Sequence, residues 1–119
     1  MKALFKISLF TLVLGVVFSF KPVETLKSAT VVIKTTVYCD HCKECETCRP
    51  LIEEKLFLEK GIREVVLDEK AMTVTVTYNP KKTSPDQIRK AISKLGYDAD
   101  EVKADPSGYE KLDGCCKKP

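Results

Sequence analysis

Apolar and polar residues alternate almost strictly in residues 72–78. One side of this segment carries Met72, Val74, Val76 and Tyr78, and threonines occupy the other side. Alternation with a period of two predicts a half-buried antiparallel strand. Residues 30–38 and 62–67 are dense in β-branched residues and are also predicted to be strands. A short last strand is expected at 97–102.

Helical spacing appears first in residues 47–61. The apolar positions at this spacing are Leu51, Ile52, Leu56 and Leu58. Thr47 is a suitable N-cap, and Pro50 is acceptable only in a first turn. Gly61 is a natural C-terminal stop. The pattern therefore places Cys48 in the first turn of this helix.

A second helix begins at Ser84. Ser84, Pro85 and Gln87 combine an N-cap, a proline at the first helical position and a capping-box partner. The predicted inner stripe consists of Ile88, Ala91, Ile92 and Leu95, and Gly96 ends the helix. The element order is βαββαβ, which predicts an α+β, ferredoxin-like sandwich. Its four-stranded antiparallel sheet would carry two helices on one face.

The first twenty residues have the pattern of an export signal. Lys2 and Lys6 precede an apolar run that is shorter than the roughly 20 residues a spanning helix needs. Residues 1–20 are therefore predicted to be a signal peptide or an uncleaved N-terminal anchor. A linker at 21–29, a domain at 30–103 and a polar, cysteine-containing tail at 104–119 would follow. The expected location is the periplasm, either free or tethered to the membrane.

Charge and length narrow the range of candidate functions further. The chain has 119 residues, 20 basic and 17 acidic side chains and a net charge of +3. Two of the basic residues belong to the export signal, so the remainder is nearly neutral and gives no reason to expect nucleic acid. The length suits one domain, and we expect a monomer.

Six cysteines carry the candidate chemistry. Four of them, Cys39, Cys42, Cys45 and Cys48, follow one another at a three-residue step. Disulfides across such short loops would restrain little of the unfolded chain, so these cysteines are interpreted as chemical rather than structural. Soft sulfur ligands select Cu(I) and, by the same logic, Hg(II), with Zn(II) as a further option. The amide donors at a helix start favour the thiolate form that a metal needs.

The order of these motifs resembles the heavy-metal-associated domain family. The resemblance covers about residues 30–100 and rests on Cys45-x-x-Cys48 with Leu51-Ile52-Glu53, on Gly61-Ile62, on Val74-Thr75-Val76 and on TSPDQIRKAISKLGYDA. That family includes small copper chaperones, N-terminal modules of metal-transporting ATPases and periplasmic mercury-binding proteins. The resemblance implies that Cys45 and Cys48 take the family's metal-binding positions. Lys43 stands where the family usually has methionine.

The remaining ligand candidates leave alternatives open. Cys39 and Cys42 could join the same ion, hold a second one or close as a disulfide. Four cysteines have the ligand count of a zinc site, whereas their spacing departs from that of an iron–sulfur cluster. His41, Cys115 and Cys116 are candidate auxiliary ligands; the simpler interpretations are a solvated loop histidine and an adjacent cysteine pair without a role. Tyr97 matches a family position beside the metal loop and is equally compatible with a core aromatic.

These observations predict an exported heavy-metal-binding protein, a scavenger or chaperone, that is not an enzyme. It would capture Cu(I) or Hg(II) on cysteine thiolates and pass the ion on by ligand exchange. A membrane metal transporter or metal-transporting ATPase is a candidate partner. Two other function classes remain at this stage: an exported thiol–disulfide oxidoreductase that uses CxxC, and a zinc-clamped or disulfide-locked interaction module.

Overall fold

The computed structural model describes residues 27–38 and 48–118. The predicted export signal, most of the linker and residues 39–47 of the cysteine segment lie outside these ranges. Within the described ranges no helix combines the length and the apolar character that a membrane crossing requires.

A three-stranded antiparallel sheet forms the floor of the domain. Its strands are β1 (Ala29–Lys34), β2 (Ile62–Asp68) and β3 (Thr73–Tyr78), and β3 lies in the centre of the order β1-β3-β2. Along β3 the buried and partly buried residues alternate, as the period of two predicts. The register pairs Ile33 with Val74 and Leu67 with Val74 from either side, so apolar residues of all three strands face the same layer.

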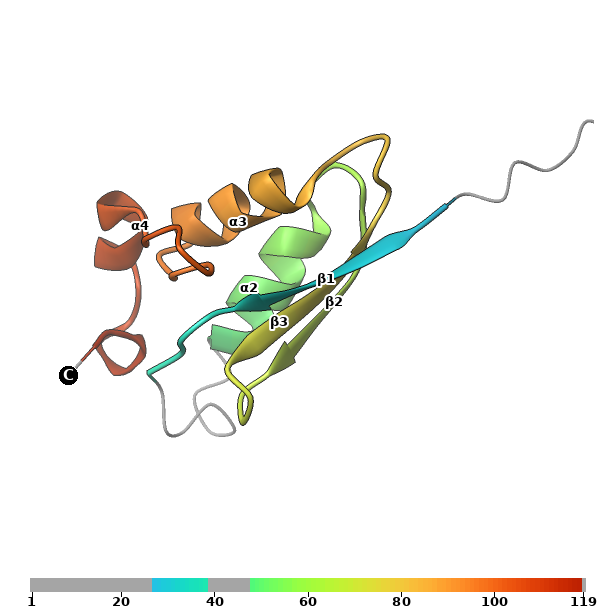
Figure 1. The fold of residues 1–119 in the computed structure, drawn as a ribbon. Helices are drawn as coiled ribbons and strands as arrows, with labels where there is room; N and C mark the ends of the chain where they lie inside the picture. Colours follow the sequence, from blue (N-terminus) through green and yellow to red (C-terminus); the bar gives the residue numbers. More distant parts are fainter. Residues whose placement is uncertain (1–26, 39–47, 119) are drawn as a thin grey trace, which may run out of the picture.

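Two ten-residue helices cover one face of this sheet. Helix α2 runs from Cys48 to Phe57 and α3 from Pro85 to Lys94, and Figure 1 shows both on the same side of the strands. The hydroxyl oxygen of Ser84 accepts a hydrogen bond from the Gln87 amide at 3.4 Å, which confirms the predicted start of α3. The predicted inward positions Ile52, Leu56, Ile88 and Ile92 are all buried between the helices and the sheet.

The predicted fourth strand is absent from the part of the chain that the structure describes. Residues 97–102 form a turn with a single bridge between Ala99 and Val102. Asp100 has a positive φ of 53°, which reverses the backbone, and its amide still donates to the Lys34 carbonyl at 2.9 Å. The Asp100 carboxylate then accepts the Lys34 amide at 2.9 Å, in place of a backbone carbonyl. Asp100 thus provides hydrogen-bond partners for both the amide and the carbonyl of Lys34, at the β1 edge where a fourth strand was expected to pair.

The segment after residue 103 packs against the domain. It contains the short helix α4 (Pro106–Glu110), which Figure 1 shows beside the end of α3, and the 3-10 helix η1 (Gly114–Cys116). Gly108, Leu112 and Cys116 are buried in this packing. We call residues 105–118 the C-terminal segment. It was predicted to belong to a polar tail; most of its residues are exposed or half-buried, and it contributes Leu112 and Cys116 to the core cluster.

Candidate metal site

Cys48 is the first residue of α2, the helix that packs on β2. The helical spacing therefore placed it correctly. Its side chain is buried, with 1% of its surface exposed, and belongs to the hydrophobic core cluster. A buried position at a helix start fixes where the Cys48 sulfur lies relative to the sheet.

The turn of α2 that carries Cys48 is anchored by Arg49. Its guanidinium donates to Glu69 at 2.7 and 3.1 Å and to Glu53 at 3.0 Å. The Glu53 carboxylate in turn accepts the Leu67 amide of β2 at 3.0 Å. Hydrogen bonding to Glu69 is the main reason why the pKa of Arg49 is raised above its usual value. This network ties the first turn of α2 to β2 and to the turn that follows it; sequence reasoning did not find it.

The other predicted metal ligands of the cysteine segment cannot be placed relative to Cys48. Cys39, His41, Cys42 and Cys45 all lie outside the described residues. Their roles therefore stay predictions.

Cys116, in the C-terminal segment, is the disulfide partner of Cys48. The two cysteines form a disulfide across a sequence separation of 68 residues, with their Cα atoms 6.8 Å apart. Cys116 is as well buried as its partner, with 2% of its surface exposed. In this oxidised form Cys48 offers no thiolate to a metal. Of the two C-terminal cysteines proposed as auxiliary ligands from sequence, Cys116 is the one that is bonded to Cys48.

Cys115 differs from its neighbour. It lies outside the disulfide, its side chain is exposed, and its sulfur is 3.9 Å from the Cys116 sulfur. Two adjacent cysteines therefore present one buried and one solvent-facing sulfur.

Two glycines bring the C-terminal segment close enough to deliver Cys116. The backbone of α4 crosses the end of α3 at Gly96 and Gly108, so tightly that a Cβ atom on Gly96 would lie 2.7 Å from Gly108 backbone atoms. Gly96 also has a φ of +100°, a conformation that suits glycine. Asp105 caps α4 by accepting the Ser107 and Gly108 amides. Hydrogen bonding from Ser107 lowers the Asp105 pKa, so this cap is charged at neutral pH.

A small cavity of about 160 Å³ lies beside Cys116. Three tyrosines contribute to its lining: Tyr38, which follows β1, Tyr97, which follows α3, and Tyr109 of α4. Tyr97 is buried and belongs to the core cluster, so it is a core aromatic that also borders the cavity next to Cys116. The cavity separates the residues that lead into the cysteine segment from the segment that carries Cys116.

Met72 was interpreted as a core residue of β3, and this interpretation is wrong. It precedes the strand with a φ of 52° and has 38% of its surface exposed. Its thioether sulfur accepts the Val37 amide at 3.5 Å, two residues before Cys39. The strand period extended one residue too far because the turn conformation overrides the alternation at its end.

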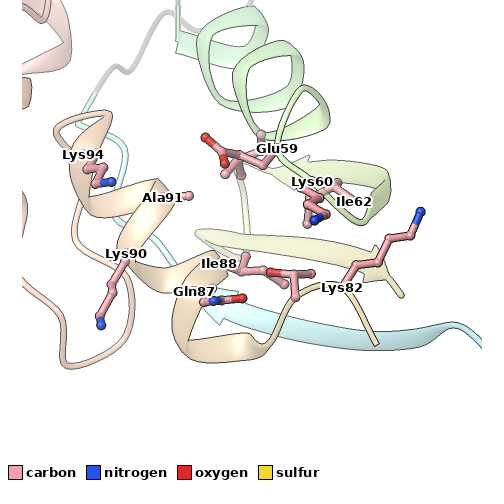
Figure 2. Close-up of a pocket in the computed structure, with 11 residues that line it drawn as sticks. Glu59, Lys60, Ile62, Lys82, Gln87, Ile88, Lys90, Ala91 and Lys94 are labelled. Carbon is pink, nitrogen blue, oxygen red and sulfur yellow. The ribbon is translucent and has the colours of Figure 1, made fainter. Parts of the chain in front are cut away.

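A second hollow, at the far end of α2, has a different character. It measures about 300 Å³ and lies between the end of α2 and α3. Figure 2 shows its charged side chains, Glu59, Lys60, Lys82, Lys90 and Lys94, around the apolar Ile62, Ile88 and Ala91. No cysteine or histidine lines it, and mostly basic residues suit a soft cation poorly. Across the described residues no group of three or more histidine, cysteine or acidic side chains is arranged to hold a metal.

Comparison with known proteins shows where this fold recurs. The family model described as "Heavy-metal-associated domain" matches residues 31–98. The chain is 34% identical over 71 residues to a copper-exporting P-type ATPase of Staphylococcus saprophyticus, covering 58% of this chain and 9% of the ATPase. It is 38% identical over 53 residues to a copper-exporting P-type ATPase of Bacillus subtilis, covering 44% of this chain and 7% of that protein. The chain thus spans less than a tenth of the length of these curated relatives.

Among solved structures, the CopZ metallochaperone superposes with a TM-score of 0.52 at 21% identity. The match covers 60% of this chain and 98% of the metallochaperone. This likeness supports the α+β fold with its antiparallel sheet and two helices.

Proposed function

Because the chain belongs to the heavy-metal-associated domain family, we propose that it is an exported carrier that binds a soft metal ion through cysteine thiolates. The observation that carries this proposal is the position of Cys48. It begins α2 inside the matched range 31–98, at the junction that follows β1, and is held there by the core and by Arg49. We assign Cys45 and Cys48 as the principal ligands, with Cys39 and Cys42 as additional thiols.

Cu(I) is the ion we favour, with Hg(II) as the second choice. Thiolate ligands select soft cations, which both ions are. The relatives named above are copper-exporting ATPases, and the structural neighbour is called a metallochaperone. A membrane metal-transporting ATPase is accordingly the partner class that we propose to receive the ion.

Transfer would proceed by ligand exchange. A partner thiolate attacks the bound ion, a bond to one of the chain's own thiolates breaks, and the ion moves without a change in its oxidation state. No bond of a substrate is made or broken, so the activity that we propose is not enzymatic. Export would follow from residues 1–20, which put the carrier outside the cytoplasm.

The disulfide of Cys48 favours one competing function, thiol–disulfide exchange. Exchange requires that a thiolate reach a disulfide sulfur, and its rate therefore depends on access. Cys48 and Cys116 are 1% and 2% exposed, so both sulfurs are shielded from an attacking protein thiol. This burial disfavours disulfide exchange through the Cys48–Cys116 pair.

The test is native mass spectrometry of the fully reduced chain titrated separately with Cu(I), Hg(II) and Zn(II). We expect a tight complex with Cu(I) or Hg(II), and loss of that complex in Cys45→Ser and Cys48→Ser while circular dichroism reports an intact fold. Wild-type affinity in both variants would contradict the ligand assignment. Disulfide reductase activity in a chain without metal affinity would support the competing function instead.

A further inference from the structure

The Cys48–Cys116 disulfide connects the start of α2, inside the segment that matches the family, to a segment that lies beyond it. Cys48 falls within residues 31–98, whereas Cys116 follows that range by 18 positions. The second sulfur beside the proposed ligand Cys48 therefore comes from the C-terminal segment, which lies outside the matched range.

The contacts that hold Cys116 in place do not depend on the bond between the sulfurs. The Asp105 amide donates to the Ser93 carbonyl at 2.9 Å, and the Ser93 hydroxyl donates to the Lys103 carbonyl at 2.7 Å. Leu112 is 93% buried between the glycine crossing and η1, since only 7% of it is exposed. These contacts involve neither sulfur atom, so we expect them to persist on reduction and to keep the Cys116 thiol beside the Cys48 thiol.

Further contacts close the end of the C-terminal segment. The Lys118 amide donates to the Tyr109 hydroxyl oxygen at 2.9 Å, and the Lys117 ammonium donates to the Glu110 carbonyl at 3.1 Å. These bonds fold residues 117–118 back over α4. Cys116 is therefore fixed from both sides along the chain.

The space around the two sulfurs suits an ion. With metal–sulfur bonds of about 2.3 Å, two thiolates on one ion stand roughly 3.8 to 4.6 Å apart, from tetrahedral to linear geometry. The 6.8 Å between the Cα atoms of Cys48 and Cys116 is at the wide end of the range for disulfides, so the backbone leaves room for that separation. The cavity of about 160 Å³ beside Cys116 allows its side chain to turn.

We propose that Cys116 is a metal ligand that partners Cys48 on one soft ion, and that the disulfide between them is the oxidised form of this ligand pair. This inference rests on the proposed function, because it names a further ligand for the same cargo. Two thiols bind the ion as thiolates and release two protons. The C-terminal segment thus covers the site and supplies one of its sulfurs.

Oxidation state then decides whether the pair can bind. A dithiol reductant opens the disulfide: its first thiolate attacks one sulfur, the Cys48–Cys116 bond breaks, and a mixed disulfide forms. The reductant's second thiol displaces the protein sulfur. The dithiol leaves as a disulfide after giving up two electrons and two protons, and the protein gains two thiols. Only this reduced pair offers thiolates to a metal.

The experiment compares the full chain with Cys116→Ala and with Cys115→Ala, the same change one position earlier on the exposed neighbour. Each reduced protein is titrated with Cu(I) against a competing chelator, and X-ray absorption counts the sulfur ligands of the bound ion. We expect Cys116→Ala to lose one sulfur ligand and about tenfold or more in affinity, equivalent to ~1.4 kcal/mol. Cys115→Ala should match the wild type. Circular dichroism checks the fold, and Cys116→Ser serves if the alanine variant misfolds.

A second measurement needs no substitution. In the reduced wild type, alkylation of Cys116 should be slower with Cu(I) bound than without it, beyond the slow rate that burial alone imposes. Equal alkylation rates, together with unchanged affinity and sulfur count in Cys116→Ala, would overturn the inference and leave the proposed function standing. A reduced wild type that binds no Cu(I), Hg(II) or other soft ion would instead remove the proposed function, and the inference with it.

Discussion

One methyl group at Gly108 should release the C-terminal segment while leaving all six cysteines in the chain. A Cβ atom at this position would overlap the Lys94 carbonyl oxygen and lie 2.8 Å from the Gly96 amide nitrogen. All of these neighbours are backbone atoms, so no flexible side chain can move aside to make room. We therefore expect Gly108→Ala to push α4 away from the end of α3.

The size of the effect follows from what this displacement uncovers. Burial of a side chain the size of Leu112 contributes about 1.5–3 kcal/mol. The hydrogen bond from the Asp105 amide to the Ser93 carbonyl contributes about 0.5–1.5 kcal/mol. A released segment regains conformational entropy, which offsets part of this loss. The reduced variant should therefore lose about 1–3 kcal/mol in its free energy of unfolding.

Denaturant unfolding of the reduced proteins measures the stability change. A second assay equilibrates each protein in a fixed mixture of reduced and oxidised glutathione and quantifies the Cys48–Cys116 disulfide by peptide mapping. That fraction should fall in Gly108→Ala, because Cys116 is no longer held beside Cys48. Gly114→Ala is the matched control in the same segment, because a Cβ atom at this position would have no atom within 4 Å of it.

The reasoning would be refuted by a Gly108→Ala protein with the wild-type unfolding midpoint and the wild-type disulfide fraction. The glycine crossing would then not be what positions Cys116. Equal losses in Gly108→Ala and Gly114→Ala would also contradict it, because a general effect of adding a methyl group would explain both.

Three further predictions follow from other contacts. Reducing the Cys48–Cys116 disulfide should lower the free energy of unfolding by roughly 4 kcal/mol, the chain-entropy value for a closed loop of 68 residues, as measured by unfolding with and without a dithiol. Asp100 has a lowered pKa, chiefly because Arg89 donates to it, so the unfolded chain binds its proton first as the pH falls. Stability should therefore decline below about pH 4, and Asp100→Asn should flatten that part of the profile of unfolding free energy against pH. Ile52→Ala, at a fully buried position, should cost about 2–5 kcal/mol by denaturant unfolding; a smaller loss would contradict its place in the core.

Local patterns were sufficient for most of the framework. The alternation around Val74 and Val76 and the capping residues at Ser84 depend on neighbours a few positions apart, and the structure confirms both. The fourth strand was different. Residues 97–102 begin and end with strand formers, Tyr97 and Val102, but Asp, Glu and Ala between them disfavour a strand. The Asp100 carboxylate also accepts the Lys34 amide, a contact between residues 66 positions apart. Strand propensity describes single residues, so it does not predict that a side chain will take the place of a backbone carbonyl as hydrogen-bond acceptor.

The C-terminal segment shows both a missed signal and a limit. Asp105-Pro106 repeats the cap-and-proline start that identified α3 at Ser84-Pro85, so α4 could have been predicted from the sequence. Its docking could not, because a glycine at 108 is equally compatible with a simple turn. Nor could the partner of Cys116 be deduced, since six cysteines allow 15 complete pairings and spacing alone does not rank them.

The unequal surroundings of Cys115 and Cys116 explain why adjacent cysteines need not share a role. A 3-10 helix turns successive side chains in different directions, so η1 leaves the Cys115 sulfur exposed and directs the Cys116 sulfur toward the core. Burial slows the access of external thiols to the inner sulfur, and the packing that buries it also brings it to Cys48. A thiol with those properties is suited to share an ion with Cys48 rather than to collect ions from solution. If Cys116 has that role, its contribution to affinity should depend on the contacts that dock the C-terminal segment, so Gly108→Ala should weaken metal binding even though it removes no sulfur.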